Sequence, residues 1–328
     1  KALQRRPSSI EPIPGAPDVF DYPRDIQPIW DRHCLPCHDA NMYQGRVLMT
    51  GDRGPMFTQS YYSLSVHLQM ADGRDLARGN YPPYSIGSAA SYLLNKVDGS
   101  HYDVKLSAKE LRMVKLWIDA AATFPGTYAA LGSGMIGPYA ELQYQTKPRV
   151  PMSSWPSMVA AGNAMRRRCI QCHAGDTQLP ATPKDNMGLR LHHLVYGEGK
   201  PRYWDPPWIK SYDDGTIRPG SPEWLRTFGD PRLPFSRHKI YNFTRPEQSI
   251  QLRAPLARAA GGLGICGVVF TSRDDPDFEI LLAAVRAAKE HLDRITRFDM
   301  PNFRPEPEYI REMIRYGILP AEFDINRH

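Results

Sequence analysis

The sequence predicts a mainly α-helical protein built of two similar units, with long Pro/Gly-rich loops and little sheet. The chain has 328 residues, about the length of two domains, and 41% of them are hydrophobic, which is enough for two modest cores. One five-residue pattern, Cys-x-x-Cys-His, occurs twice, at residues 34–38 and 169–173. The 31 prolines and 25 glycines favour ordered loops between short helices over regular sheet.

The first unit has the order helix, motif, loop and helix. Residues 21–33 carry apolar residues at helical spacing and lead directly into the first motif. A loop rich in Gly, Tyr and Met follows, and residues 82–94, which open with two prolines, predict a short helix. Ser107 and Glu110 form a capping box, which predicts the start of the strongest helix of this unit.

The second unit repeats this order. Residues 154–168 predict a helix that ends at the second motif, with Ser154 as its N-cap. After a long loop, Pro246 opens a short helix, and Asp275 opens a long one with an apolar face. A last helix is predicted over residues 307–316.

Both motifs have the form that attaches haem c. In that form the two thiols make thioethers to the haem vinyl groups, and the adjacent histidine binds the iron. With 5 Cys and 10 His in the chain, random placement would give roughly 0.002 such motifs. The sequence therefore predicts two covalently attached haem c groups, held by Cys34, Cys37 and His38 and by Cys169, Cys172 and His173.

Each haem is expected to lie in its own unit. The repeated order predicts tandem cytochrome c-like helical domains over residues 1–135 and 151–328, joined by a linker at residues 136–150. Paired Cys-x-x-Cys patterns also bind zinc, and a single one can be a redox dithiol. A zinc site would bring both cysteine pairs to one ion, whereas these pairs lie about 135 residues apart and each has its own histidine. The fifth cysteine, Cys266, is predicted to be a small buried thiol.

The residue opposite each motif histidine decides what a haem can do. Two strong protein ligands favour electron transfer, and an open position allows catalysis. For the first haem, His101 is the leading candidate for the sixth ligand, because it lies in a loop just before the last helix of the unit. An ordinary role away from the iron is the alternative for His101. Weaker candidates are His67, Met42 and Met70.

For the second haem, His238 is the first choice opposite the motif histidine, and a surface histidine bonded to a carbonyl group is the alternative interpretation. Met300, in a Met-Pro loop ahead of the final helix, is the second choice. His291 is predicted to lie on a helix surface. The adjacent pair His192-His193 is expected to serve local packing, because neighbouring side chains diverge.

The predicted haem attachment also indicates the compartment, because these thioethers are normally made after export, in the bacterial periplasm or an equivalent space. The chain begins Lys-Ala-Leu-Gln-Arg-Arg without an apolar signal segment, so we expect any signal peptide to have been removed or to lie outside this sequence. No apolar stretch approaches the ~20 residues that cross a bilayer. A net charge of +6 and a pI near 9.0 favour acidic partners, namely other redox proteins or subunits of a larger complex, and not nucleic acid.

Five sequence segments are informative besides the two motifs: DIQPIWDRHC (25–34), TGDRGPM (50–56), GTYAALGSG (126–134), RHKIYNFTRPE (237–247) and RFDMP (297–301). Together they resemble the two-haem, C-terminal portion of the hydrazine synthase alpha subunit family. The resemblance implies a preceding β-propeller, a catalytic first haem, and a second haem with two histidine ligands that transfers electrons. It also implies zinc at the first motif histidine and an iron-binding tyrosine four residues later. That position is Met42 here, and Tyr43 follows it.

Three classes of function remain open. The favoured class is an electron-transfer protein or subunit in which both haems have two protein ligands. The alternative is a haem oxidoreductase, like hydrazine synthase, whose open first haem acts on a small nitrogen species with Tyr43 or His101 in its pocket. The loop over residues 42–62 is expected to line that pocket or seal a haem edge with Asp52, Arg53, Tyr61 and Tyr62. The third class is an assembly or sensor module that the haems stabilise.

Overall fold

The computed structural model describes the central parts of both units. The described residues are 9, 11–55, 57–67, 69–71, 82–124, 152–174, 179–180, 182–183, 236–297, 299–303 and 307–324. The predicted linker at residues 136–150 and the pair His192-His193 lie outside them. Within the described residues the chain is mainly helical and its β-structure consists of isolated bridges, which confirms the predicted fold class. None of the helices described is both long and apolar enough to cross a membrane.

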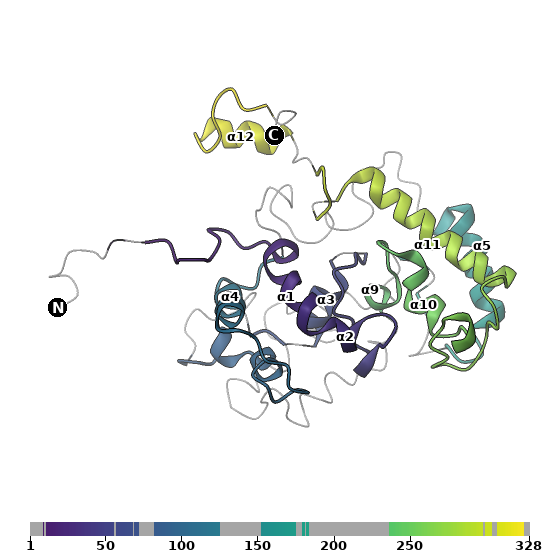
Figure 1. The fold of residues 1–328 in the computed structure, drawn as a ribbon. Helices are drawn as coiled ribbons and strands as arrows, with labels where there is room; N and C mark the ends of the chain where they lie inside the picture. Colours follow the sequence, from purple (N-terminus) through teal and green to yellow (C-terminus); the bar gives the residue numbers. More distant parts are fainter. Residues whose placement is uncertain are drawn as a thin grey trace.

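The first half is built from short helices around one core (Figure 1). Asp21 caps the first of them, and its carboxylate accepts from the Arg24 backbone N–H at 3.2 Å. The predicted capping box is confirmed, because Ser107 and Glu110 each accept from the backbone N–H of the other. The elements in chain order are a π-helix at Tyr22–Ile26, α1 at Gln27–His33, α2 at Leu35–His38, a 3₁₀ turn at Gln44–Arg46, α3 at Gln59–Val66, 3₁₀ turns at Ser88–Ala90 and Tyr92–Lys96, and α4 at Ala108–Asp119.

The continuous short helix predicted over residues 82–94 is wrong. Two 3₁₀ turns, Ser88–Ala90 and Tyr92–Lys96, occupy its second part. Gly87 has a left-handed φ of +77°, and Ser91 between the turns is extended. Because neither residue has helical backbone angles, the backbone cannot continue as one α-helix through this segment.

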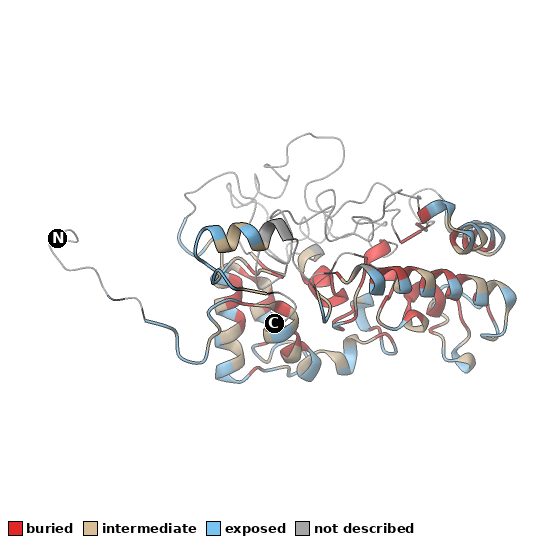
Figure 2. Ribbon diagram, turned by 90° about the horizontal axis from the view of Figure 1, so that it is seen from above, coloured by how far each residue is buried: buried red, intermediate tan, exposed pale blue. Residues whose placement is uncertain are grey.

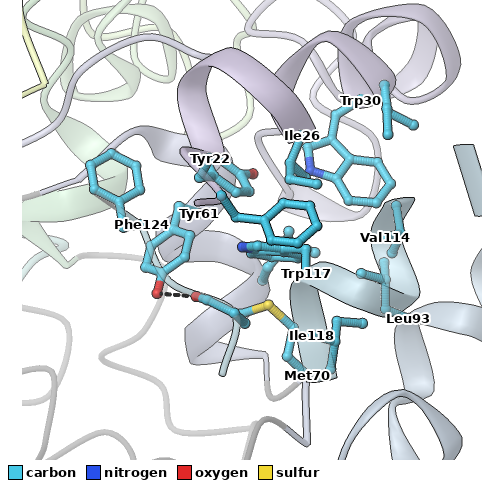
Figure 3. Close-up of a cluster of buried hydrophobic side chains, with 14 of the residues drawn as sticks. Tyr22, Ile26, Trp30, Tyr61, Met70, Leu93, Val114, Trp117, Ile118 and Phe124 are labelled. Atoms are coloured by element: carbon cyan, nitrogen blue, oxygen red, sulfur yellow. Dashed lines mark hydrogen bonds between the residues drawn. The ribbon is translucent and has the colours of Figure 1, made fainter. Parts of the chain in front are cut away.

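Aromatic side chains from three segments form the core of the first half (Figure 3). Tyr22 of the π-helix, Tyr61 of α3 and Trp117 of α4 meet with ring centroids 5.0 to 6.4 Å apart. The Tyr61 hydroxyl donates to the Ala122 carbonyl at 2.9 Å, so its polar end is satisfied. Burying each large apolar side chain contributes about 1.5–3 kcal/mol, and this core therefore holds the helix that carries the first motif.

In the second half, α5 packs along α11, the longest helix described (Figure 1). Figure 2 shows buried residues along one side of α11. Arg167 pairs with Asp277 and Arg168 with Asp275, each at 2.5 Å, so the end of α5 is tied to the start of α11. The elements are a 3₁₀ turn at Met152–Ser154, α5 at Pro156–Arg168, α9 at Arg237–Ile240, a 3₁₀ turn at Pro246–Gln248, α10 at Ile250–Arg253, a 3₁₀ turn at Arg258–Ala260, α11 at Pro276–Ile295 and α12 at Pro307–Arg315.

The predicted N-cap of α5 is wrong by one residue. Ser154 ends a 3₁₀ turn, and the extended Trp155 is the N-cap, without a side-chain bond to the helix. Pro156 has no N–H to satisfy, so this helix begins without a polar cap. The start of α11 is as predicted, since the Asp275 carboxylate accepts from the Asp277 backbone N–H at 2.9 Å.

The two halves interlock along a shared interface. Asp52 of the first half accepts from Arg245 of the second at 2.6 Å. Arg297 donates to the Gly54 carbonyl at 2.8 Å and pairs with Asp299 at 2.6 Å. A small apolar cluster joins the loop after the first motif to the second half, and its buried members are Ala40, Tyr43, Leu48, Ile250 and Leu263. The segments on either side of the predicted linker therefore support each other.

Candidate functional site

The two Cys-x-x-Cys-His motifs adopt the same backbone conformation. The first cysteine of each ends a helix, with φ −111° and ψ −33° at Cys34 and φ −117° and ψ −29° at Cys169. The backbone N–H of the motif histidine donates to the carbonyl of that cysteine, at 2.9 Å for both His38 and His173. The sequence pattern thus closes the same helical turn twice, and each turn carries two thiols and an imidazole.

The environments of the thiols also repeat. Cys34 and Cys169 are half-buried against the two cores, whereas Cys37 and Cys172 are exposed. Burial, helped by the neighbouring Cys37, raises the pKa of Cys34 to about 12, and burial, helped by Cys266, raises the pKa of Cys169 to about 11. A redox-active dithiol depends on a lowered thiol pKa, so these environments do not favour a thioredoxin-like centre.

Cys266 is exposed, and the prediction of a buried thiol is wrong. It lies in a glycine-rich loop in which Gly264 and Gly267 have left-handed φ values of +59° and +79°. Glycine adopts these angles without strain, so the loop turns back on itself and leaves the cysteine outside the core. The same loop returns to the second motif, since Arg168 donates to the Val269 carbonyl at 3.0 Å.

One ring nitrogen of His38 is bonded to the backbone. Its Nδ1 lies 3.0 Å from the carbonyl oxygen of Gln44. A carbonyl oxygen only accepts, so Nδ1 carries the proton in the neutral ring and Nε2 keeps its lone pair. A backbone carbonyl that orients the ring in this way is typical of metal-binding histidines, because it fixes the tautomer and increases the basicity of the other nitrogen.

The structure brings His101 to His38. Their ring centroids are 6.1 Å apart and their planes differ by 8°. Two imidazoles bound to opposite sides of one metal by bonds of about 2.0 Å would have centroids roughly 6 Å apart. Burial, with the nearby charges of Lys96 and His38, lowers the pKa of His101, which favours the neutral form that binds metals. The separation of the two rings therefore agrees with that of two imidazoles that would hold one haem iron.

The weaker candidates for the first haem lie elsewhere. Met42 is 55% exposed, and Met70 is buried within the first core. His67 Nε2 accepts from Lys239 Nζ at 3.0 Å. Burial, together with that ammonium, lowers the pKa of His67 to about 3. Met70 and His67 are thus engaged in packing or hydrogen bonding, whereas Met42 lies at the surface.

Tyr43 packs in the small cluster that joins the halves. It is buried, its φ is +46°, and burial raises its pKa to about 12 although the nearby Arg46 opposes the shift. A left-handed φ at a residue with a Cβ costs on the order of 1–2 kcal/mol, so the surrounding contacts hold this turn in place.

The other residues expected to line a pocket in the 42–62 loop contribute to the core and to the interface between the halves. Tyr61 lies in the first core, and Tyr62 of α3 donates to Ser236 Oγ of the second half at 2.9 Å. Asp52 bonds to Arg245 as described above, and Arg53 donates to the Asp299 carbonyl at 2.9 Å. Residues 42–62 are not one loop, because α3 begins at Gln59. Of the four side chains, Tyr61 belongs to the first core, and the other three join the two units.

His238 is a buried imidazole with unusual surroundings. It is 2% exposed, and its ring stacks on Tyr62 with centroids 4.6 Å apart. Among the residues that the structure describes, neither ring nitrogen of His238 has a hydrogen-bond partner. Burial, with the charges of Arg237 and Arg297, holds the pKa of His238 well below its usual range. An unsatisfied buried polar group costs about 1–3 kcal/mol, and an iron atom could satisfy one of these nitrogens.

The assignment of His238 opposite His173 stays a prediction. The His238 ring contacts Tyr62 of the first half, and a Cβ added at Gly54 would lie 3.3 Å from the His238 carbonyl oxygen. Met300, the second choice, is partly buried against the second core. These contacts place His238 at the interface between the halves and Met300 beside the second core.

The prediction of a helix-surface position for His291 is wrong. Its side chain is 4% exposed and meets the Trp155 ring edge-on, with centroids 5.0 Å apart. Trp155 precedes α5, so the contact belongs to the packing of α5 against α11.

Sequence analysis missed Lys239. This residue is 4% exposed, and its Nζ contacts His67 Nε2 at 3.0 Å and the Arg46 carbonyl at 3.5 Å. Burial, followed by the charge of Arg46, lowers its pKa to about 8. Lysines are almost always exposed, and a basic segment such as RHKI contains no local signal that this one is buried.

Within the described ranges, no three His, Cys, Asp or Glu side chains gather as they would around a metal ion. A haem iron takes two protein ligands, so this finding does not bear on haem. Comparisons of the chain with protein-family models, curated proteins and solved structures find no match. The two motifs and their surroundings are therefore the basis for a functional proposal.

Proposed function

We propose that this chain is a di-haem c-type cytochrome that transfers electrons, with one haem attached at each Cys-x-x-Cys-His motif. The pair His38 and His101 carries the proposal, because its parallel rings lie 6.1 Å apart and the His38 tautomer keeps the lone pair on Nε2. Two imidazole ligands leave no open position on the iron, which favours electron transfer over substrate binding.

The residues of the first site have separate tasks. Cys34 and Cys37 would hold the haem through thioethers, and the Gln44 carbonyl orients His38. His101 approaches from a loop in which its own carbonyl accepts from a backbone N–H three residues later, at 3.0 Å. A haem bound there supplies a one-electron redox centre. The protein contributes preset ligand positions, so little rearrangement is needed when the charge changes.

The second motif would attach its haem in the same way. Cys169, Cys172 and His173 lie on a turn with the same hydrogen bonds as the first motif. His238 is our choice for the opposite ligand. Its buried ring nitrogens have no hydrogen-bond partner among the described residues, and binding to a metal would satisfy one of them, whereas a purely structural role would not. Met300 is the competing ligand.

Contacts between the first motif region and the second half support electron exchange within the chain. Asn41, three residues after His38, accepts from Arg253 at 2.6 Å. The Arg253 carbonyl accepts from the Leu263 backbone N–H at 2.7 Å, and Leu263 packs in the same cluster as Tyr43. A firm connection keeps the separation of two redox centres constant, and the rate of electron exchange depends on that separation.

Haem attachment can be tested by mass spectrometry of the mature protein. The denatured mass should exceed the polypeptide mass by two haem groups, and acid-acetone extraction should leave the colour with the protein. Cys34→Ala and Cys172→Ala should each lose the haem of one motif while the other haem remains. Recovery of a zinc-containing protein without haem would contradict the proposal.

Electron paramagnetic resonance separates electron transfer from the competing activity. Two low-spin ferric signals are expected if both irons have two protein ligands. A high-spin signal from the first haem, with nitric oxide or carbon monoxide binding in the reduced protein, would favour a haem oxidoreductase acting on a small nitrogen species. In that case Tyr43 or His101 would be a pocket residue.

The proposal extends to relatives, compartment and partners. The sequence segments quoted above support a relation to the hydrazine synthase alpha subunit family, and haem attachment supports export to the periplasm or an equivalent space. A net charge of +6 supports docking with acidic redox proteins or subunits of a larger complex. Such docking should weaken as the salt concentration rises, which surface plasmon resonance would measure for each partner tested.

A further inference from the structure

Lys239 is a buried cation for which the described residues provide no acidic partner. In the part of the chain that the structure describes, its ammonium contacts the His67 ring at 3.0 Å and the Arg46 carbonyl at 3.5 Å, and no carboxylate. An ammonium has no acceptor, so the facing His67 Nε2 is unprotonated and that ring is neutral. Lysines that are 4% exposed are nearly always paired with an acid. Within the described ranges, no acid therefore balances the positive charge of Lys239.

A second positive charge acts on Lys239. The Arg46 guanidinium acts on Lys239 electrostatically, and its backbone has a left-handed φ of +56°. We call Lys239, Arg46 and His67 the Lys239 cluster. The cluster has two cations and a neutral ring, so it has the composition of an anion-binding site.

The Lys239 cluster shares a turn with the first motif histidine. In the 3₁₀ turn Gln44–Arg46, the Gln44 carbonyl accepts from His38 Nδ1. The Arg46 carbonyl of the same turn accepts from Lys239 Nζ. The ammonium thus lies at the edge of the first candidate haem site, although it belongs to the second half. The contact between α3 and α9 holds it there.

We propose that Lys239, together with Arg46, binds a propionate carboxylate of the first haem. The inference rests on the proposed function, because the haem supplies the anion. Hydrogen bonds from Lys or Arg to a carboxylate are short and strong, and one such bond would balance the buried charge. The second half would then complete the haem site of the first.

Lys239→Met, Lys239→Arg and the exposed control Lys115→Met test the proposal in the haem-loaded protein. Resonance Raman spectra report the propionate bending band, and a redox titration reports the midpoint potential of each haem. Lys239→Met should shift the band and lower the potential of the first haem, because loss of a nearby positive charge favours the ferric state. Lys239→Arg should retain the hydrogen-bonded band, and Lys115→Met should match the wild type.

A loaded Lys239→Met protein with an unchanged band and potential at the first haem would overturn the proposal, and so would a shift at the second haem alone. If the Lys239→Met protein does not accumulate, a measurement on the wild-type protein tests the proposal instead. Ferric protein labelled with ¹⁵N-lysine should show one hyperfine-shifted ammonium resonance that Lys239→Arg lacks, and its absence would refute the assignment. Displacement of that resonance by added acetate would show a site for free anions instead. Wild-type protein without covalent haem would contradict the proposed function itself.

Discussion

Arg297→Met removes a buried ion pair of the second half together with a hydrogen bond that joins the two halves. The side chains of Arg297 and Asp299 are each 1% exposed. Arg297 donates to both carboxylate oxygens of Asp299, at 2.6 and 2.8 Å, and to the Gly54 carbonyl at 2.8 Å. Methionine preserves much of the side-chain volume, but it leaves the carboxylate and the carbonyl without these donors.

The expected loss of stability follows from the burial of Asp299. Removing one partner of a buried pair costs about 3–5 kcal/mol, because the other charge stays buried. Arg53 offsets part of this cost, since its Nε lies 3.7 Å from Asp299 Oδ2. We therefore expect Arg297→Met to lower the free energy of unfolding by about 3 kcal/mol. With a urea m-value of about 3 kcal/mol/M, the midpoint would fall by about 1 M.

Urea unfolding of the haem-loaded protein, followed by circular dichroism and Soret absorption, measures this loss. Arg311→Met is the matched control, because Arg311 is 69% exposed and its pair with Glu312 should be worth less than about 1 kcal/mol. The double variant Arg297→Met/Asp299→Leu should recover most of the loss, since apolar replacement of a whole buried pair is often neutral. A loss below about 1 kcal/mol in the single variant, or no recovery in the double variant, would refute the reasoning.

Three further predictions concern the ligands and the pH dependence. His101→Ala should convert the first haem to high spin and allow carbon monoxide to bind it; a reduced variant that binds none would exclude His101 as a ligand. At the second haem, His238→Ala should have the same effect and Met300→Ala almost none, and the reverse pattern would identify Met300. Partial burial raises the pKa of Glu110, but hydrogen bonds with Ser107, then Arg32 and His33, outweigh this effect and lower that pKa to about 2. Its charged form therefore stabilises the fold fully above pH 4.5, and this contribution is lost as the pH falls towards 2. The difference in free energy of unfolding between the wild type and Glu110→Gln should be constant above pH 4.5 and should shrink as the pH falls towards 2; a difference that does not shrink would contradict the assignment.

Structural features that depend on a few neighbouring residues were predictable from the sequence. The capping box of Ser107 and Glu110, the Asp275 cap of α11 and the turn of each Cys-x-x-Cys-His motif all depend on bonds between residues two to four positions apart. Such bonds form whenever the local sequence permits them, so the pattern alone indicates the structure.

Positions set by tertiary contacts were not predictable. His291 lies next to Leu292 of the apolar face of α11 and was assigned to the surface, but Trp155 packs over it. Cys266 has the size and polarity of a buried residue, yet the left-handed glycines beside it lead the chain outward. The contact over His291 comes from a separate segment, and the turn at Cys266 comes from backbone angles of the flanking glycines. Hydrophobic periodicity contains no information about either.

Some contacts of the candidate site could likewise be predicted from the sequence, and others could not. The proximity of His101 to His38 follows from chain order, because the loop before the last helix of the unit returns to the motif. The contact of Lys239 with His67 joins residues 172 positions apart, and that of Asp52 with Arg245 joins residues 193 apart. No spacing rule connects residues so distant, and only the folded chain shows that they meet.

These long-range contacts change what the repeated order of parts means. Two independent domains would allow each redox centre to move relative to the other. Here the turn after the first motif receives Arg253 at Asn41 and Lys239 at Arg46, both from the second half. A substitution in residues 236–253 can therefore alter the first site without touching the first motif. The sequence repeats a unit, but the folded chain builds the surroundings of the first site from both copies. If the proposed haems are present, this shared construction would hold them at a fixed separation instead of in two separate carriers.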